Sequence, residues 1–216
     1  MVLLIISLKR VIMKIFLVRH GQTTGDIEDR YGGDYDDHLS DLGRKQVGEL
    51  AEMLAGLNIN VQPTRLNIRL NIKIISSPKI RAKETAEIIS RKIGADVEIA
   101  DGFRERNRYG ILTGMTKTEA KEKYPELAEE VKDLHATIAG AEDYETFRER
   151  IHVALAEIVS RNDDTIAIVT HGGPMKLIFE DVFNVKKIDI DDCGFAEIED
   201  DNGVLKVIKL NGIRVE

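Results

Sequence analysis

Residues 13–26 read MKIFLVRHGQTTGD, and this stretch decides the fold. The apolar run at 15–18 predicts a buried strand over 13–19. The run ends at Arg19, His20 and Gly21, so a cation and an imidazole lie next to each other at the end of a buried strand and a glycine follows them. Either the strand simply reaches the surface there, or the two side chains are held in place to bind or transform something.

The rest of the chain alternates between short apolar runs and longer amphipathic segments. We expect further strands over 72–77, 95–100, 164–171, 194–199 and 204–209. We expect helices over 39–57, 78–93, 144–161 and 175–183, and one near 116–136 that breaks at Pro125. A Gly-Gly-Pro turn is expected before the helix at 175–183, a hairpin turn at 200–203 (DDNG), and a loop over 60–72. This alternation predicts an α/β fold, a three-layer α/β/α sandwich whose central sheet is mostly parallel with an antiparallel edge.

Local signals set the expected helix ends. Ser40 is a suitable N-cap, Pro78 suits a first helical position, and Gly94 suits a helix terminus. The expected buried face of the helix at 39–57 consists of Leu42, Val47, Leu50, Met53 and Leu54.

Length and composition restrict the class of protein. A chain of 216 residues with 43% hydrophobic and 32% charged residues suits one sizeable globular domain. The net charge of −7 argues against a nucleic-acid partner, and the single Cys193 suits a reducing, cytoplasmic location. The apolar run at 2–6 is too short to span a membrane, and no membrane partner is expected. We interpret 1–12 as an N-terminal extension, with Met13 as an alternative start, and 13–216 as one domain; a homo-oligomer is left open.

Three of the predicted strands end in polar side chains of a similar kind. Arg19 and His20 follow the first, Ser77 and then Arg81 follow the second, and His171 follows the strand at 164–171; a glycine comes after each histidine. Each of these residues alone has an ordinary explanation, such as a hydrogen-bonded histidine or a solvated helix arginine. Because the carboxyl ends of parallel strands meet at one edge of a sheet, we expect them together in one site.

Two arginines and two imidazoles beside helix N-termini make an anion pocket suited to phosphate. In an acidic protein such a pocket must gather its cations locally. A neutral imidazole there could attack phosphorus and form a phosphohistidine. A metal-dependent hydrolase that uses His20 and His171 as ligands is the alternative; neighbouring arginines would repel the cation, so no metal ligand is assigned.

Three segments resemble the signatures of a known family. RHGQT (19–23), SSPKIRAKET (76–85) and VTHGG (169–173) are similar to those of the histidine phosphatase superfamily, also called the phosphoglycerate mutase-like family, over about 13–195. The resemblance implies a phosphoglycerate mutase-like fold, with His20 as the phosphorylated nucleophile and Arg19, Arg81 and His171 as the rest of the phosphate pocket. It also implies substrate-binding positions at Arg19, Gln22, Thr23, Arg30, Gly33, Arg81, Arg106 and Gly172.

The resemblance further implies a proton donor and one departure. Glu105 matches the carboxylate that acts as general acid and base, although a surface ion pair with Arg104 or Arg106 is the alternative for it. The family commonly has asparagine six residues after the nucleophile, where this chain has Asp26. A carboxylate there would repel phosphate, so Asp26 is not assigned to the pocket.

The resemblance leaves more than one activity open. We expect a histidine-type acid phosphatase that hydrolyses a small phosphorylated metabolite without a cofactor, with the segment 106–140 capping the pocket. The alternative is a phosphoglycerate mutase that depends on 2,3-bisphosphoglycerate, because FRERNRYGILTGMTK (103–117) resembles the mutases. The segment 115–140 lacks the paired arginines with which mutases grip their substrate, which favours the phosphatase. A non-catalytic phosphate-binding module is the third reading.

Overall fold

The computed structural model describes residues 12–59, 72–161 and 163–216. Six strands form one sheet in the order β3-β2-β4-β1-β5-β6. They are β1 (Met13–Arg19), β2 (Ile72–Ser76), β3 (Asp96–Ile99), β4 (Thr165–Thr170), β5 (Ile188–Asp201) and β6 (Val204–Val215). The first four strands in this order pair in parallel, and β5 and β6 add an antiparallel edge. The predicted sheet is confirmed.

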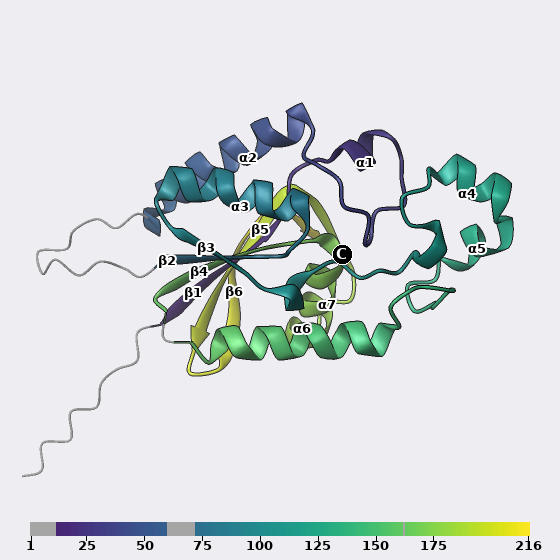
Figure 1. The fold of residues 1–216 in the computed structure, drawn as a ribbon. Helices are drawn as coiled ribbons and strands as arrows, with labels where there is room; N and C mark the ends of the chain where they lie inside the picture. The colour runs from purple at the N-terminus through teal and green to yellow at the C-terminus, as the bar shows by residue number, and fades with distance from the viewer. Residues whose placement is uncertain (1–11, 60–71, 162) are drawn as a thin grey trace, which may run out of the picture.

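Helices cover both faces of the sheet (Figure 1). The described helices are α1 (Thr24–Ile27), α2 (Asp41–Leu54), α3 (Ile80–Ile93), α4 (Lys117–Lys123), α5 (Pro125–Glu130), α6 (Tyr144–Val159) and α7 (Gly172–Phe183). A π-helical turn (Ala55–Ile59) and two 3₁₀ turns (Asp101–Phe103 and Gly110–Leu112) complete the elements. Along β1, Phe16 and Val18 face the core under α2 and α3, whereas Ile15 and Leu17 face the core under α6 and α7. This alternation explains why the whole strand is apolar, and it confirms the three-layer sandwich.

Two helix ends follow their local signals. The Ser40 hydroxyl accepts a hydrogen bond from the backbone N–H of Gly43 at 2.9 Å, and Gly94 ends α3 with a φ of 74°. On α2, Val47, Leu50 and Leu54 are buried as predicted. Leu42 and Met53 are 51% and 40% exposed, so their assignment to the buried face was wrong.

The start of α3 differs from the prediction. The helix begins at Ile80, two residues after Pro78, and its N-cap Lys79 makes no side-chain capping bond. Instead, the N–H of Ile80 donates to Asp36 Oδ1 at 2.7 Å. A carboxylate from a distant loop therefore satisfies the helix N-terminus, a contact that the local sequence does not reveal.

The C-terminal half also differs in its boundaries. Gly172 and Gly173 form the first turn of α7 with Pro174, because proline is tolerated in the first turn of a helix. The predicted Gly-Gly-Pro turn was therefore wrong. The hairpin turn at 200–203 is confirmed by positive φ at Asn202 (56°) and Gly203 (85°), but both flanking strands are longer than expected.

The segment that holds α4 and α5 lies beyond the carboxyl ends of the parallel strands (Figure 1). A small separate core joins it to the loop after α1; its members are Tyr31 of that loop and Leu112, Ala120, Val131 and Ile138. Pro125 separates the two helices as predicted, although α5 ends at Glu130 rather than near 136. The expected loop at 60–72 lies, but for residue 72, outside the described residues, as does most of the expected extension at 1–12. None of the helices in the described ranges combines the length and apolar character that a bilayer crossing requires.

Candidate active site

Three strand ends meet at one edge of the sheet because β2, β4 and β1 are neighbours. The N–H of His20 donates to Thr170 O at 3.1 Å, and the N–H of Ser77 donates to Val169 O at 2.9 Å. The rings of His20 and His171 lie edge to face with centroids 5.0 Å apart. The structure thus brings together the histidines that the strand ends predicted to meet.

His20 is held in one tautomer. Its Nδ1 lies 2.8 Å from the carbonyl oxygen of Gly21, which can only accept, so Nδ1 carries the proton. The unprotonated Nε2 accepts a hydrogen bond from Arg81 Nε at 3.2 Å. Burial, followed by the charges of Arg81 and Arg19, lowers the pKa of His20 well below its usual value. His20 therefore presents a neutral ring with the lone pair of Nε2 directed into the site.

His171 is fully buried and presents a donor. Its Nε2 lies 2.7 Å from Ser77 Oγ, and that oxygen also accepts from the N–H of Lys79 at 3.3 Å. The Ser77 hydroxyl has one proton to donate, and in the tautomer in which Nε2 accepts it, the ring proton of His171 is on Nδ1. That Nδ1 has no hydrogen-bond partner among the described residues. Burial, followed by the charge of Arg81, lowers the pKa of His171 well below its usual value, so the ring is neutral.

Arg19 supplies a second donor of this kind. Its Nη1 donates to Ile190 O at 2.5 Å and its Nη2 pairs with Asp192 at 3.1 Å. Its buried Nε has no partner within the described part of the chain. This nitrogen lies at the N-terminus of α7, 4.0 Å from where a Cβ on Gly172 would stand. Buried donors without partners are uncommon, and two of them beside a helix N-terminus indicate an anion-binding site.

Arg81 is buried and held from several sides. Besides its bond to His20, Nη1 donates to Tyr35 O at 2.6 Å and to Asp37 Oδ1 at 2.9 Å, and Nη2 donates to Gly33 O at 3.0 Å. The loop between α1 and α2 therefore fixes the guanidinium over the nucleophile.

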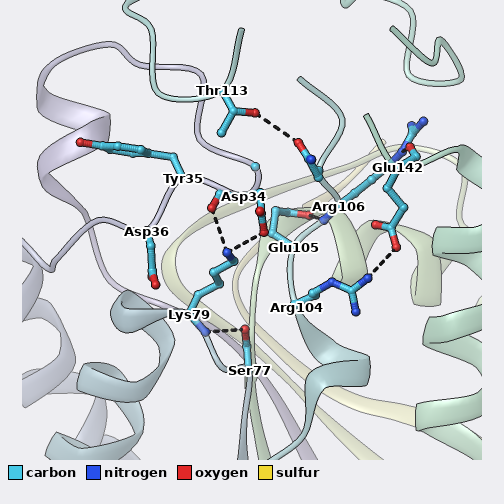
Figure 2. A network of polar contacts seen from close by, with 12 residues as sticks. Asp34, Tyr35, Asp36, Ser77, Lys79, Arg104, Glu105, Arg106, Thr113 and Glu142 are labelled. Atoms are coloured by element: carbon cyan, nitrogen blue, oxygen red, sulfur yellow. Dashed lines mark hydrogen bonds and ion pairs between the residues drawn. The ribbon is translucent and has the colours of Figure 1, made fainter. Parts of the chain in front are cut away.

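Glu105 reaches the same site from the loop after β3. Its Oε2 accepts from the N–H of Gly173 at 3.0 Å and its Oε1 from the N–H of Arg106 at 2.8 Å. Arg104 is turned away toward Glu142, 3.0 Å distant, as Figure 2 shows. The alternative of a surface ion pair with Arg104 or Arg106 does not describe Glu105. Gly173 is required here, since a Cβ on it would lie 2.1 Å from Glu105 Oε1.

These groups open into a cleft of about 570 Å³. Among the residues assigned from the sequence, those that line it are Arg19, His20, Thr23, Arg30, Gly33, Arg81, Glu105, Arg106 and Gly172. His171 lies beneath it. Gln22 is not among the lining residues; its side-chain oxygen accepts from Ser40 Oγ at 2.8 Å.

Two of the lining arginines are engaged with the protein. The guanidinium of Arg106, 4% exposed, donates to the carbonyl oxygens of Leu134, Ala136 and Glu142. Arg30 pairs with Glu28 and donates to Gly114 O at 2.5 Å. Arg106 thus holds the segment 134–142 in place, a role that the sequence reading of it as a substrate ligand did not anticipate.

Asp26 was not assigned to the pocket, but it lines the cleft, with its carboxylate bonded to its own loop. Its Oδ2 accepts from both the N–H and the hydroxyl of Thr23, each at 2.8 Å, and this closes a capping box at the start of α1. Asp37 is a functional neighbour that the sequence reading missed, whereas Ser77 was expected at this edge of the sheet but was given no role. No signal in DYDD (34–37) shows which aspartate faces Arg81.

Within the described ranges no three His, Cys, Asp or Glu side chains are grouped to hold a metal ion.

Comparisons with known proteins place this site in a family. The model of the histidine phosphatase superfamily (branch 1) matches residues 15–212. A bifunctional protein of Mycobacterium tuberculosis is 31% identical over 167 residues, 76% of this chain, which spans only 43% of that relative. A metal-independent phosphoserine phosphatase of Arabidopsis thaliana is 30% identical over 175 residues, 78% of this chain and 68% of that protein.

A solved structure shares the fold. The protein YhfR of Bacillus stearothermophilus superposes with a TM-score of 0.76 at 24% identity, over 90% of this chain and 95% of that one. Together with the family match over most of the chain, the arrangement of strand ends, histidines and arginines leads to one conclusion. The chain belongs to the histidine phosphatase superfamily, branch 1.

Proposed function

We propose that the protein is a phosphomonoester phosphatase that works through a phosphohistidine at His20. One observation carries this proposal. The unprotonated Nε2 of a buried, neutral imidazole lies among two buried donors that lack partners in the described residues, Arg19 Nε and His171 Nδ1. Such an arrangement binds a phosphoryl group and attacks it at the same place.

In the first step, His20 Nε2 attacks phosphorus, the P–N bond forms, and the ester P–O bond breaks. Protonated Glu105 gives its proton to the leaving oxygen, so the alcohol departs neutral. In the second step, a water attacks phosphorus while Glu105 takes a proton from it, and the P–N bond breaks. The products are inorganic phosphate and free His20, with Glu105 protonated again. Arg19, Arg81 and His171 stabilise the phosphoryl oxygens through both steps.

The proposed substrate is a small phosphorylated metabolite, and no cofactor or metal is required. The relative named above as a metal-independent phosphoserine phosphatase supports this reading, and the mutase alternative is not favoured. Two basic residues of the cap also favour the phosphatase over the mutase, because Lys117 and Lys132 pair with Asp29 and Glu129. The net charge of −7 and the free Cys193 support a cytoplasmic enzyme without a nucleic-acid partner.

A panel of phosphomonoesters, assayed with a chelator present, tests the activity. It includes O-phosphoserine and 3-phosphoglycerate, the latter with and without 2,3-bisphosphoglycerate. We expect phosphate release that the chelator does not change. Loss of turnover with the chelator would favour the metal hydrolase, and isomerisation faster than release would favour the mutase. Phosphate binding without any turnover would favour the binding module.

Trapping the covalent adduct tests the nucleophile. Acid-labile label from a ³²P substrate should appear on the wild type and on His152→Ala, a histidine outside the cleft that bonds Asp181 at 2.7 Å. It should be absent from His20→Ala. If the His20→Ala protein retains the label, the nucleophile is another residue.

A further inference from the structure

Asp37 makes a buried ion pair with the arginine that faces the nucleophile. The side chains of Asp37 and Arg81 are 4% and 5% exposed, and Asp37 Oδ1 lies 2.9 Å from Arg81 Nη1. A buried pair of this kind is costly unless the remaining polar atoms of both partners are also satisfied. For Asp37 they are, because Oδ2 accepts from the N–H of Gly25 at 3.2 Å.

The contacts of Asp37 require a carboxylate. Both of its oxygens accept, one from Arg81 and one from Gly25, so an asparagine would turn a donor toward one of these donors. The site is also closely packed, because a Cβ on Gly25 would lie 2.4 Å from Asp37 Oδ2.

The donors of Arg81 are almost fully used. A guanidinium carries five N–H groups. Four of them are directed to His20 Nε2, Tyr35 O, Asp37 Oδ1 and Gly33 O. Three of these four partners belong to the loop over 33–37, and Asp37 is the charged one. The loop therefore fixes the plane of the guanidinium and leaves Nε directed at the nucleophile.

This geometry has a consequence for the catalytic cycle. When His20 Nε2 forms a bond to phosphorus, its lone pair is used and it can no longer accept from Arg81 Nε. The same N–H is then released beside the new phosphoryl group, whose oxygens are strong acceptors. Because phosphorus must occupy the direction of the Nε2 lone pair, the Nε–H turns from the ring nitrogen to a phosphoryl oxygen, while the anchored Nη groups keep the guanidinium beside the new group.

We propose that Asp37 is a positioning residue that anchors Arg81, so that one N–H serves first the free imidazole and then the phosphoryl group. This inference rests on the proposed function. Asp37 acts through Arg81 and takes no proton in either step.

The test uses the intact protein labelled with ¹⁵N. The Nε–H resonance of Arg81, assigned by its loss in Arg81→Lys, reports the bond to His20 directly. The test variant is Asp37→Asn. The matched control is Asp34→Asn, the same change in the same loop, where Asp34, whose side chain is 47% exposed, pairs with Lys79 Nζ at 2.6 Å (Figure 2).

We expect the Arg81 Nε–H to be protected from exchange with water in the wild type and in Asp34→Asn. In Asp37→Asn, protection should fall about tenfold or more, since a hydrogen bond to a charged group contributes at least that factor. The Kd for inorganic phosphate should rise about tenfold, and kcat/KM should fall by a similar factor. In Asp34→Asn, the Kd for phosphate and kcat/KM should each stay within about twofold of the wild-type value.

Two results would overturn the proposal. One is a protected Arg81 Nε–H in Asp37→Asn. The other is tighter phosphate binding by Asp37→Asn, which would mean that Asp37 only offsets the positive charge of Arg81 and does not position it. Thermal melts establish that each variant is folded, and Asp37→Ser, a smaller residue with a hydroxyl acceptor, replaces Asp37→Asn if that variant does not fold. A wild type without turnover would reject the proposed function, whereas the resonance and the phosphate titration would still decide the role of Asp37.

Discussion

The N–H of Gly173, in the first turn of α7, donates to Oε2 of Glu105 at 3.0 Å. The helix that follows β4 therefore positions the carboxylate that follows β3, and the two sides of the cleft depend on each other. The backbone bond from Arg106 to Oε1 completes the support, so Glu105 is held by two N–H groups rather than by a charged side chain. The activity should therefore depend both on the carboxyl group of Glu105 and on the backbone at Gly173 that holds it in place.

Replacing Glu105 with glutamine should remove proton transfer while keeping its size. We expect kcat/KM, which reports the first step, to fall about 100-fold or more for an alkyl phosphate, in the usual range for loss of a general acid. The fall should be much smaller for p-nitrophenyl phosphate, whose leaving group needs no proton. Glu149→Gln, a change outside the cleft, is the control. Equal losses for both substrates would show that Glu105 does not protonate the leaving group.

Replacing Gly173 with alanine should displace Glu105, because the new Cβ would lie 2.1 Å from its Oε1. We expect kcat/KM to fall about 100-fold, as displacement of a reacting group by about 1 Å can cost. Gly48→Ala is the control, since a Cβ there meets nothing within 4 Å and α2 gains a better helix former. An active Gly173→Ala enzyme would argue against the role of Glu105.

Much of this site could be predicted from the sequence because its main parts follow buried strands. The apolar runs before His20 and His171 are unambiguous, and the topology of a parallel sheet then brings their ends together. The position of Arg81 could be predicted in the same way, because it lies in the first turn of the helix that follows β2.

The supporting contacts could not be predicted, for physical reasons. In DYDD (34–37), one aspartate caps α3 and another pairs with Arg81, and only tertiary structure separates these roles. In FRERNR (103–108), the sequence does not show that Arg106 is the arginine buried against the backbone of 134–142. Polar side chains with long-range partners leave no periodic pattern, unlike apolar ones.

Replacing Ser77 with alanine should remove the hydrogen bond that favours one tautomer of the His171 ring. Without the hydroxyl, Nε2 is left buried and unsatisfied, at a cost of about 1–3 kcal/mol in the free energy of unfolding. The proton is then no longer confined to Nδ1, so we expect inorganic phosphate to bind about tenfold more weakly. Calorimetric titration measures this binding. The control is Ser90→Ala, because the Ser90 hydroxyl donates to Ala95 O at 2.6 Å near the C-terminal end of α3. Unchanged phosphate binding would place His171 outside the phosphate pocket.

The free energy of unfolding should fall as the pH is lowered from 7 toward 5. Burial, chiefly, lowers the folded-state pKa of both His20 and His171 below the unfolded value of about 6.5. Below that value the unfolded chain binds protons that the folded protein does not, so stability is present at higher pH and lost as the pH falls. Each histidine adds up to about 1.4 kcal/mol per pH unit to this slope.

Urea unfolding at several pH values measures the slope, and variants identify its source. His20→Asn should make the dependence between pH 7 and 5 shallower by roughly one such contribution. Carboxylates whose pKa is lowered, such as Glu84 and Asp181, contribute only below about pH 4.5, so they do not obscure this window. The same slope in His20→Asn and wild type would mean that His20 takes up its proton in the folded protein, which would contradict a neutral nucleophile.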